Sequence, residues 1–144
     1  MKAKTINEFR GKYFFLSNFY KCEFVLDRVV WRSVEHFYQA QKTIDLTQQL
    51  AIINAPTAEE AKQLGQTTIL RSDWNLVKDS VMFLGVSAKF SIPKLRERLL
   101  ATGDSTLIEG NDWGDTYWGV TEAGGKNKLG ILLMEIREKL NKSL

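Results

Sequence analysis

The stretch Trp31–Lys42 constrains the fold of this chain more than any other part of the sequence. Ser33 is a favoured N-cap residue, because its hydroxyl can accept a hydrogen bond from an amide of the first helical turn. The residues that follow contain neither Gly nor Pro, so the stretch predicts a helix over Ser33–Thr43. Much of this expected helix is apolar or aromatic. The residues on its neighbouring faces are Val34, Phe37, Tyr38 and Gln41.

Three polar side chains, Glu35, Gln39 and Lys42, share one stripe of this expected helix, because they are spaced i, i+4 and i+7. If the helix is buried, the stripe must face a hydrogen-bonded network or a cleft, since an unpaired buried charge is costly. A carboxylate beside an amine in a partly dry site is suited to acid–base or covalent chemistry. The alternative is a solvated helix face with a weak ion pair, and this stretch alone does not decide between the two.

Length and composition favour one soluble α+β domain spanning residues 1–144, with 44% hydrophobic and 26% charged residues. The net charge of +3 permits an anionic ligand without requiring a nucleic acid. One cysteine, Cys22, and one histidine, His36, predict no disulfide, no metal site and no cofactor. Cys22 is expected to be a small buried side chain rather than a nucleophile activated by His36. We expect a cytoplasmic protein, because no apolar run follows Met1–Lys4 or approaches the roughly 20 residues of a spanning helix.

The rest of the chain predicts short strands and further helices around the Ser33–Thr43 helix. The expected strands are Thr5–Phe9, a hairpin of Cys22–Leu26 and Val29–Trp31 with its turn at Asp27-Arg28, and Thr106–Glu109. The aromatic stretch Tyr13–Tyr20 is expected to be a loop. The other expected helices are Asp45–Asn54, one from Thr57 to about Gly65 with a Thr57/Glu60 capping box, one from Asp73-Trp74 to about Phe90, one capped by Ser91 and ended by Gly103, and one after Gly130 that ends near Asn141.

Two loops carry further candidate chemistry, and each has a plain structural alternative. Asp115 lies among Trp113, Tyr117 and Trp118, so it is either a carboxylate in a dry aromatic pocket or a turn residue that binds nearby amides. Gly124–Lys128 precedes a helix and is either an anion cradle or an ordinary glycine turn; it lacks the spacing of a nucleotide-triphosphatase loop. Two further residues each allow two interpretations. Arg71 is either a ligand of a phosphate group or an ordinary surface residue, and Trp74 is either a platform on which a base stacks or a core residue.

Taken together, these motifs resemble the NADAR/YbiA-like family, and they follow one another in that family's order along nearly the whole chain. The most specific motif is Ser-x-Glu-His-x-x-Gln-Ala-x-Lys, here Ser33–Lys42, and the later Lys-Asn-x-Leu-Gly supports it. The other matching segments are Phe15–Tyr20, Asp73-Trp74, Asp115–Gly119 and Gly125–Gly130.

The resemblance implies a compact, mainly helical α+β domain with a small sheet that cleaves N-glycosidic bonds. One branch of the family hydrolyses phosphoribosylamino-pyrimidines early in riboflavin synthesis, and another removes ADP-ribose from guanine in nucleic acid. The partner is therefore expected to be a phosphorylated ribosyl metabolite or ADP-ribosylated nucleic acid, and not a membrane. The resemblance implies catalytic positions at Glu35, Trp74 and Asp115, with Lys42 as a further candidate. The positions expected to bind substrate are Ser17, Asn18, Arg71, Tyr117, Trp118, Lys126, Asn127 and Lys128.

Two chemical routes and one non-catalytic alternative fit these residues. In the first route Glu35 activates water or stabilises the cationic sugar, Asp115 assists, and Trp74 stacks on the base. In the second route the Lys42 amine attacks the anomeric carbon of an opened ribose and forms a Schiff base. The alternative from another class is a module that binds ADP-ribose or a similar nucleotide without cleaving it.

Overall fold

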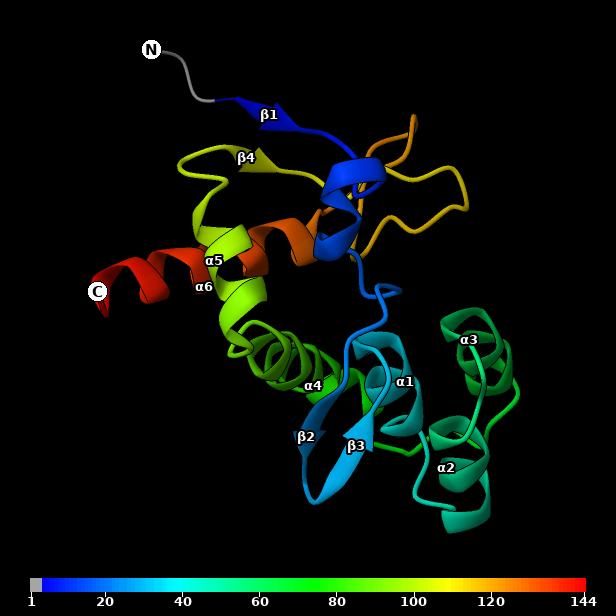
Figure 1. The fold of residues 1–144 in the computed structure, drawn as a ribbon. Coiled ribbons are helices and arrows are strands. Elements are labelled where there is room, and N and C mark those ends of the chain that lie inside the picture. The colour runs from blue at the N-terminus through cyan, green and yellow to red at the C-terminus, as the bar shows by residue number, and fades with distance from the viewer. Residues whose placement is uncertain (1–3) are drawn as a thin grey trace. The chain divides into compact units, whose positions relative to one another are not determined.

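The structure is a computed structural model that describes residues 4–144. The described elements are, in order, β1 (Thr5–Ile6), the 3-10 helix η1 (Gly11–Leu16), β2 (Phe24–Leu26), β3 (Val29–Trp31), α1 (Val34–Ala40), α2 (Leu46–Ile53), α3 (Ala58–Gln66), α4 (Trp74–Lys89), α5 (Pro93–Leu100), β4 (Thr106–Leu107) and α6 (Lys128–Lys142) (Figure 1). None of the helices described is long and apolar enough to cross a membrane. The chain forms two compact units, which we name the central unit, Asn18–Ile92, and the terminal unit, the chain up to Ser17 together with Pro93–Leu144.

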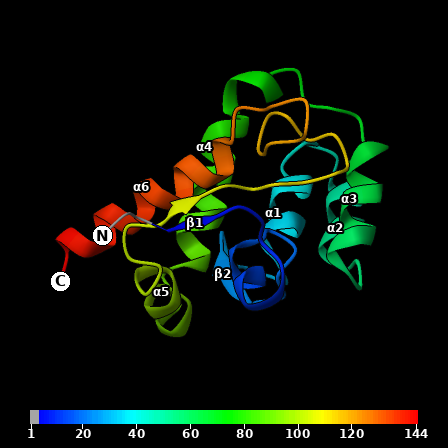
Figure 2. The same ribbon diagram turned by 90° about the horizontal axis from the view of Figure 1, so that it is seen from above.

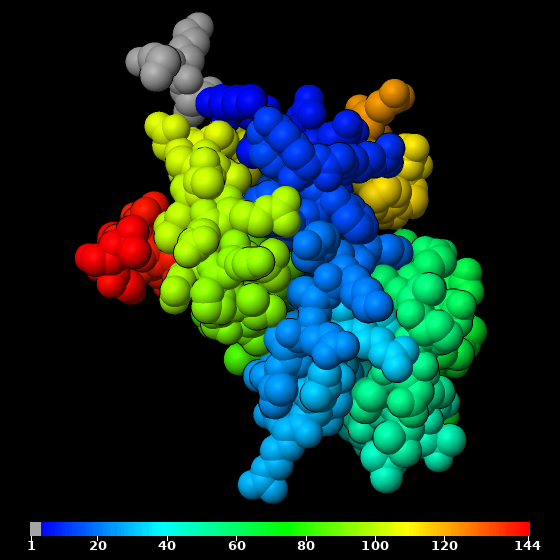
Figure 3. Space-filling view, in the orientation of Figure 1, coloured from blue at the N-terminus to red at the C-terminus, as the bar shows by residue number. Residues whose placement is uncertain are grey.

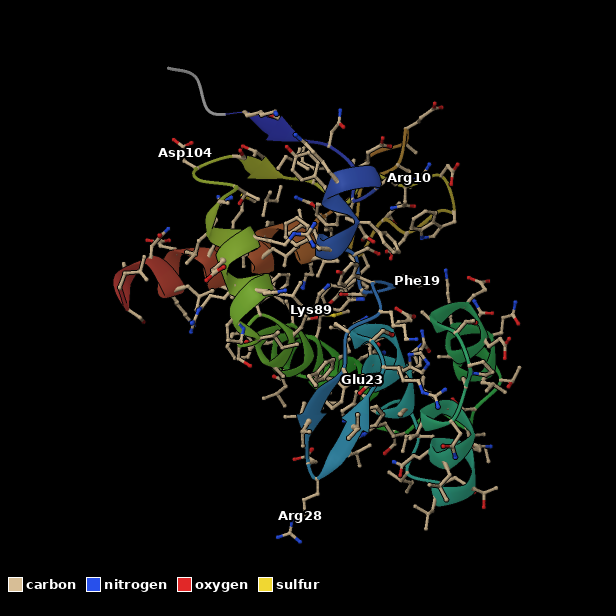
Figure 4. All side chains as sticks on the ribbon, in the orientation of Figure 1. Arg10, Phe19, Glu23, Arg28, Lys89 and Asp104 are labelled. Atoms are coloured by element: carbon tan, nitrogen blue, oxygen red, sulfur yellow. The ribbon has the colours of Figure 1, made fainter. Side chains whose placement is uncertain are left out.

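The central unit begins with the predicted hairpin, in which β2 and β3 pair antiparallel with Val25 opposite Val30. The two turn residues Asp27 and Arg28 have φ values of 55° and 64°, the left-handed conformation that a two-residue hairpin turn requires. The tip of this hairpin projects at the lower edge of the view in Figure 3, and Arg28 points away from it in Figure 4. The predicted turn is therefore confirmed, although neither residue is a glycine.

Helix α1 is the core element of the central unit, because every residue from Val34 to Ala40 is buried. It packs against α2, α3 and α4. Gly85 allows α4 to approach closely, since a Cβ at that position would lie 2.9 Å from the ring of Phe37. Side-chain caps begin three of these helices: Ser33, Asp45 and Thr57 accept hydrogen bonds from the backbone amides of His36, Gln48 and Glu60, respectively. The caps at Ser33 and Thr57 were predicted from the sequence.

The terminal unit contains the parallel pair β1 and β4, with Thr5 opposite Thr106 (Figure 2). Helix α6 packs against β4, and α5 packs against α6. Gly130 permits the first of these contacts, because a Cβ there would collide with the backbone carbonyl of Leu107. The mainly helical α+β class predicted from the sequence is confirmed, and residues 4–144 contain two separate two-stranded sheets. A single domain over residues 1–144 stays a prediction.

Several local predictions differ from the structure. Two strands are shorter than expected, because β1 ends at Ile6 rather than Phe9 and β4 ends at Leu107 rather than Glu109. Helix α1 ends at Ala40, so Lys42 lies just beyond the helix rather than on it. The aromatic stretch after Gly11 begins as the 3-10 helix η1 rather than as a loop. Ser91 does not cap the helix that follows; instead its hydroxyl donates to the carbonyl of Ala88, at the end of α4.

Candidate active site

The buried pair Glu35 and Gln39 lies at the centre of the candidate site. Their exposed fractions are 8% and 4%, so the alternative of a solvated helix face is wrong for these two residues. Because they are one turn apart on α1, the Gln39 amide reaches back, and its Nε2 donates to Glu35 Oε2 at 2.7 Å. The Glu35 backbone amide donates to the carbonyl of Asn18 at 3.1 Å. The carboxylate is thus buried and held in one orientation by its own helix.

Lys42 brings an amine to the same site from the chain just after α1. Its Nζ lies 5.6 Å from the ring centroid of Tyr38, and the residue is half-buried. Burial lowers the pKa of Lys42, the neighbouring charges of Lys62 and Lys78 lower it further, and the Glu35 carboxylate opposes them. A lowered pKa increases the fraction of neutral amine, which is the nucleophilic form.

The start of α4 and the residues just before it contact the segment around Lys42 through Trp74 and Arg71. The Trp74 ring packs edge-on against Tyr38 with centroids 5.1 Å apart, and 6% of the residue is exposed. The Arg71 backbone amide donates to the Lys42 carbonyl at 2.7 Å, which ties the two segments together. Trp74 therefore supports the aromatic ring beneath the Lys42 amine, while its predicted stacking on a base stays a prediction.

The Arg71 guanidinium is already paired with a neighbouring carboxylate. Its Nε and Nη2 donate to the two oxygens of Asp73 at 2.6 and 3.0 Å. This two-point pairing lowers the pKa of Asp73 and raises that of Arg71. Most of the charge that Arg71 was expected to offer a phosphate is therefore balanced within the protein.

Asn18 supports the site from the segment that precedes β2. The residue is buried, and its side-chain amide donates to the sulfur of Met82 at 3.4 Å. Its backbone carbonyl accepts from Glu35, as described above. Asn18 thus links α4 to the start of α1, and its contact with a ribose stays a prediction.

His36 uses both of its ring nitrogens for structural hydrogen bonds. Nε2 lies 3.0 Å from the carbonyl of Ala55, so it must carry the proton and donate. Nδ1 therefore accepts, and the Ser33 hydroxyl donates to it at 2.7 Å. Burial lowers the pKa of His36 and raises that of Cys22. His36 is not available as a base for the Cys22 thiol, in agreement with the prediction that Cys22 is not the nucleophile.

His36 gives the protein a predictable pH dependence of stability, since it is the only histidine in the chain. Its pKa in the folded state lies below the ordinary value of 6.5, so the unfolded chain binds a proton first as the pH falls. The free energy of unfolding should therefore fall between pH 7.5 and 5.5 by up to about 1.4 kcal/mol. Urea unfolding at the two pH values measures this change. The change should be absent in His36→Gln, and an equal change in that variant would assign it to other groups.

Gly65 on α3 fixes the position of Gln39, although nothing in the sequence marked it. A Cβ at Gly65 would lie 2.9 Å from Gln39 Cβ and closer still to the side-chain carbonyl. That carbonyl oxygen, Gln39 Oε1, is buried and has no hydrogen-bond partner among residues 4–144. The glycine therefore leaves room for the amide that orients Glu35.

Replacing Gly65 with Ala should lower kcat about ten- to hundredfold, because displacement of the Gln39 side chain moves Glu35, and a shift of about 1 Å can lose that much rate. Turnover of Gly65→Ala, Gln39→Ala and the double variant measures the effect. The double variant should be no worse than Gln39→Ala alone, since both changes act through one contact. Gln66→Ala, at an exposed position of the same helix, is the control. Additive losses in the double variant would contradict this role.

The other predicted residues lie in the terminal unit, and Asp115 has the geometry of a turn residue. Its Oδ1 accepts from the backbone amides of Tyr117 and Trp118 at 3.1 and 2.9 Å. Its own amide and carbonyl bind the side chain of Asn111. These contacts match the turn alternative considered for this residue. A catalytic role for Asp115 stays a prediction.

Tyr117 is the contact point for two of the predicted lysines. Lys128 Nζ donates to the Tyr117 hydroxyl at 3.0 Å, and the amines of Lys126 and Lys128 lie 5.4 and 4.6 Å from its ring centroid. The Tyr117 and Trp118 rings meet edge-on, with centroids 4.9 Å apart. Binding of substrate by this group stays a prediction, as it does for Ser17, whose amide donates to the carbonyl of Phe14.

Several amides at the start of α6 are engaged within the protein. The amides of Lys126, Lys128 and Leu129 donate to carbonyls of residues 116–118. Asn127 adopts φ 52°, and its side chain bonds both the carbonyl of Leu107 and the amide of Glu109. These contacts attach the start of α6 to β4 and the residues after it. They favour the glycine-turn alternative over an anion cradle.

Taken by unit, the structure brings together Asn18, Glu35, Lys42, Arg71 and Trp74 in the central unit. The terminal unit contains the other predicted residues, which are Asp115, Tyr117, Trp118, Lys126, Asn127 and Lys128. Among residues 4–144 there is no cluster of three or more His, Cys, Asp or Glu side chains that could hold a metal ion.

Comparison with known proteins identifies relatives along most of the chain. A family model described as the NADAR domain matches residues 6–141. An N-glycosidase from Nostoc punctiforme is 41% identical over 136 residues, which is 89% of this chain and 86% of that protein. The N-glycosidase YbiA from Escherichia coli is 38% identical over 128 residues, covering 86% of this chain and 79% of that protein.

A longer relative and a solved structure complete the comparison. A riboflavin biosynthesis protein from Vibrio vulnificus is 39% identical over 130 residues; the match takes in 88% of this chain but only 35% of the length of that protein. The NMR structure of Escherichia coli YbiA has a TM-score of 0.90 and 36% identity, and the match covers 99% of this chain and 88% of that one.

Proposed function

Since this chain belongs to the NADAR domain family, we propose that it is an N-glycosidase that cleaves the bond between a ribosyl carbon and the nitrogen of a base. The names of its relatives from Nostoc punctiforme and Escherichia coli support this activity, because the chain spans most of each. The family and the YbiA-like fold expected from the sequence are both confirmed.

The observation that carries this proposal is a buried carboxylate whose charge acts on a half-buried amine. Glu35 is held by Gln39 at 2.7 Å, and its charge acts on Lys42. A module that only binds ADP-ribose gains nothing from a buried carboxylate near bound phosphates, since like charges repel. An enzyme needs this carboxyl group to move protons during cleavage. The pair therefore favours catalysis over simple binding.

Of the two routes, we place the reaction on the Lys42 amine. Glu35 in its acid form gives a proton to the ring oxygen as the ribose opens, and the base nitrogen is left joined to C1 as an imine. The neutral Lys42 amine adds to C1, and the base leaves with a proton, which gives an imine between Lys42 and the sugar. Water then adds to C1, releasing the sugar aldehyde and restoring the amine. The net reaction consumes one water and needs no oxidant or reductant.

The substrate is a phosphoribosylamino-pyrimidine of riboflavin synthesis. The support for this class comes from the relatives of Vibrio vulnificus and Zea mays, both named riboflavin biosynthesis proteins, although this chain matches only 35% and 20% of their lengths. A second candidate is ADP-ribose attached to guanine in nucleic acid, which the net charge of +3 favours. The cytoplasmic location and the absence of a membrane partner stay predictions.

The test is to offer both substrates to the purified protein: a phosphoribosylamino-pyrimidine, and DNA that carries ADP-ribosylated guanine. Chromatography follows the released base, with Glu35→Gln as the matched inactive control. Release from the pyrimidine alone supports the metabolic substrate, and release from the DNA alone supports the second candidate. No release from either, together with calorimetric binding of ADP-ribose, would replace the enzyme with a binding module.

A further inference from the structure

Both backbone groups of Lys42 are held by hydrogen bonds, although the residue lies beyond the end of α1. Its amide donates to the carbonyl of Gln39 at 3.2 Å, and its carbonyl accepts from the Arg71 amide at 2.7 Å. The first bond prolongs the last turn of α1, and the second ties that turn to the residues before α4. The point from which the Lys42 side chain starts is therefore fixed, and its side-chain torsions place the amine.

The ring of Tyr38 lies beneath that amine, because the two residues are spaced one helical turn apart at the end of α1. Lys42 Nζ is 5.6 Å from the ring centroid, a distance at which the negative face of an aromatic ring attracts a cation. The exposed fraction of Tyr38 is 8%, and Lys42 is half-buried. Water therefore screens the attraction less than it would at the protein surface.

The Tyr38 ring is itself held by the ring of Trp74. The two centroids are 5.1 Å apart and the ring planes meet at 63°, which is the edge-on arrangement that aromatic pairs favour. Trp74 is buried and begins α4, whereas Tyr38 belongs to α1. Turning the Tyr38 ring away from Lys42 would disturb this contact between the two helices. The orientation of the ring under the amine is thus set by the packing of α4 on α1.

The proposed reaction places positive charge on the nitrogen above this ring. The opened sugar carries a positive charge that C1 shares with the base nitrogen, and attack by the neutral amine moves this charge to Lys42. One proton then passes from Lys42 to the base, which leaves with the electrons of its bond to C1. A protonated imine between Lys42 and the sugar remains. Burial, which lowers the pKa of Lys42, opposes a cation at this nitrogen, whereas the face of the Tyr38 ring favours it.

We propose that Tyr38 is a positioning residue for N-glycosidic cleavage, whose ring holds the Lys42 amine and stabilises the protonated imine formed on it. The inference rests on the proposed function and assigns a part in it to a residue that the sequence did not mark as functional. The aromatic ring carries this role, and the hydroxyl group does not. Because the charge appears only after the amine has attacked, the ring acts on kcat more than on KM.

The kinetic test separates the ring from the hydroxyl group. Tyr38→Phe keeps the ring, and Tyr38→Met replaces it with a flexible apolar side chain. With a phosphoribosylamino-pyrimidine as substrate, kcat should stay within about threefold of the parent in Tyr38→Phe and fall about tenfold in Tyr38→Met, as expected for a partly dry contact between a cation and a ring. The KM of both variants should stay near the parent value.

Tyr13→Met is the matched control, because Tyr13 also lies under a lysine amine, with Lys12 Nζ 5.0 Å from its ring centroid. Tyr13 belongs to the terminal unit and to none of the candidate groups described above. Its replacement should leave kcat near the parent value. An equal fall in Tyr13→Met would overturn the proposal, and so would equal losses in Tyr38→Phe and Tyr38→Met.

A second measurement does not depend on turnover. Ribose 5-phosphate in its open form is an aldehyde, which condenses with the Lys42 amine to the same protonated imine and releases water. Cyanoborohydride transfers hydride to C1 of that imine, and mass spectrometry of the peptides measures the stable amine on Lys42. Labelling should be as fast in Tyr38→Phe as in the parent and about tenfold slower in Tyr38→Met. Lys42→Arg should acquire no label at that position.

This labelling keeps the proposal separate from the function on which it rests. If the parent cleaves no substrate, the proposed function fails, and the labelling rates still decide the role of Tyr38. A parent protein without label on Lys42, or equal labelling rates in Tyr38→Met and the parent, would overturn that role. Melting curves check that each variant folds. If Tyr38→Met does not fold, phenylalanines with increasing fluorine content in place of Tyr38 keep the ring and weaken its negative face, and labelling should slow in that order.

Discussion

Glu35→Gln should lower single-turnover cleavage at least ~100-fold while the protein melts at the parent temperature. Glutamine matches the size of glutamate and suits a helix. Its side-chain oxygen can still accept the hydrogen bond that Gln39 Nε2 now gives to Glu35. What the variant lacks is a group that can give and take a proton at that point. The rate of base release in a single turnover measures the loss directly.

Two further variants show whether this loss reflects chemistry or packing. Glu35→Asp should also be poor, because shortening the side chain withdraws the carboxyl group from its position by about 1 Å. Glu60→Gln, at an exposed position of α3, removes a charge without touching the site and should retain the parent rate. If Glu35→Gln melts like the parent and cleaves within a few-fold of it, Glu35 is a structural residue and the site must be sought elsewhere.

The helix starts of the central unit could be predicted from the sequence because they depend on local chemistry. Ser33, Asp45 and Thr57 each accept a hydrogen bond from an amide three residues later. Such a bond needs only the right side chain before a helix-forming run. The hairpin turn at Asp27-Arg28 was predicted from its place between two apolar runs.

The end of α1 could not be predicted in the same way. Nothing after Ala40 breaks a helix, so the sequence extended it to Thr43. In the structure the Thr43 hydroxyl accepts from the Asp45 amide and donates to Gln48, which anchors the start of α2. The position of Lys42 is thus set by the next helix rather than by helix propensity.

The candidate site was predictable only where its residues are neighbours in the sequence. The stripe of Glu35 and Gln39 follows from helical spacing alone. The influence of Lys62 and Lys78 on the pKa of Lys42 depends on how α3 and α4 pack against α1, and no spacing in the sequence encodes it. Gly65 is similar, because its importance lies in the Gln39 side chain that crosses over it.

Reduction with borohydride during turnover should join the substrate sugar to Lys42 through a stable amine. The expected route passes through an imine between Lys42 and the sugar carbon, and borohydride converts such an imine to a bond that survives digestion. Mass spectrometry of the peptides should place the added mass on Lys42. Lys42→Met should lose the adduct and at least ~100-fold in turnover, as expected when a positioned reacting group is removed.

Lys42→Arg separates the charge of this residue from its reactivity, because a guanidinium stays protonated and does not attack carbon under these conditions. It should be as inactive as Lys42→Met, whereas a purely electrostatic role would leave it active. In the parent the rate should pass through a maximum as the pH rises, because the reacting pair of Glu35 and Lys42 must hold one proton. The fall at high pH should begin below pH 10.5, since burial, with the charges of Lys62 and Lys78, lowers the pKa of Lys42 despite the opposing effect of Glu35. Lys21→Met, at an exposed position, should keep both the adduct and this pH profile. Turnover that survives in Lys42→Met without any adduct would assign the attack to water activated by Glu35.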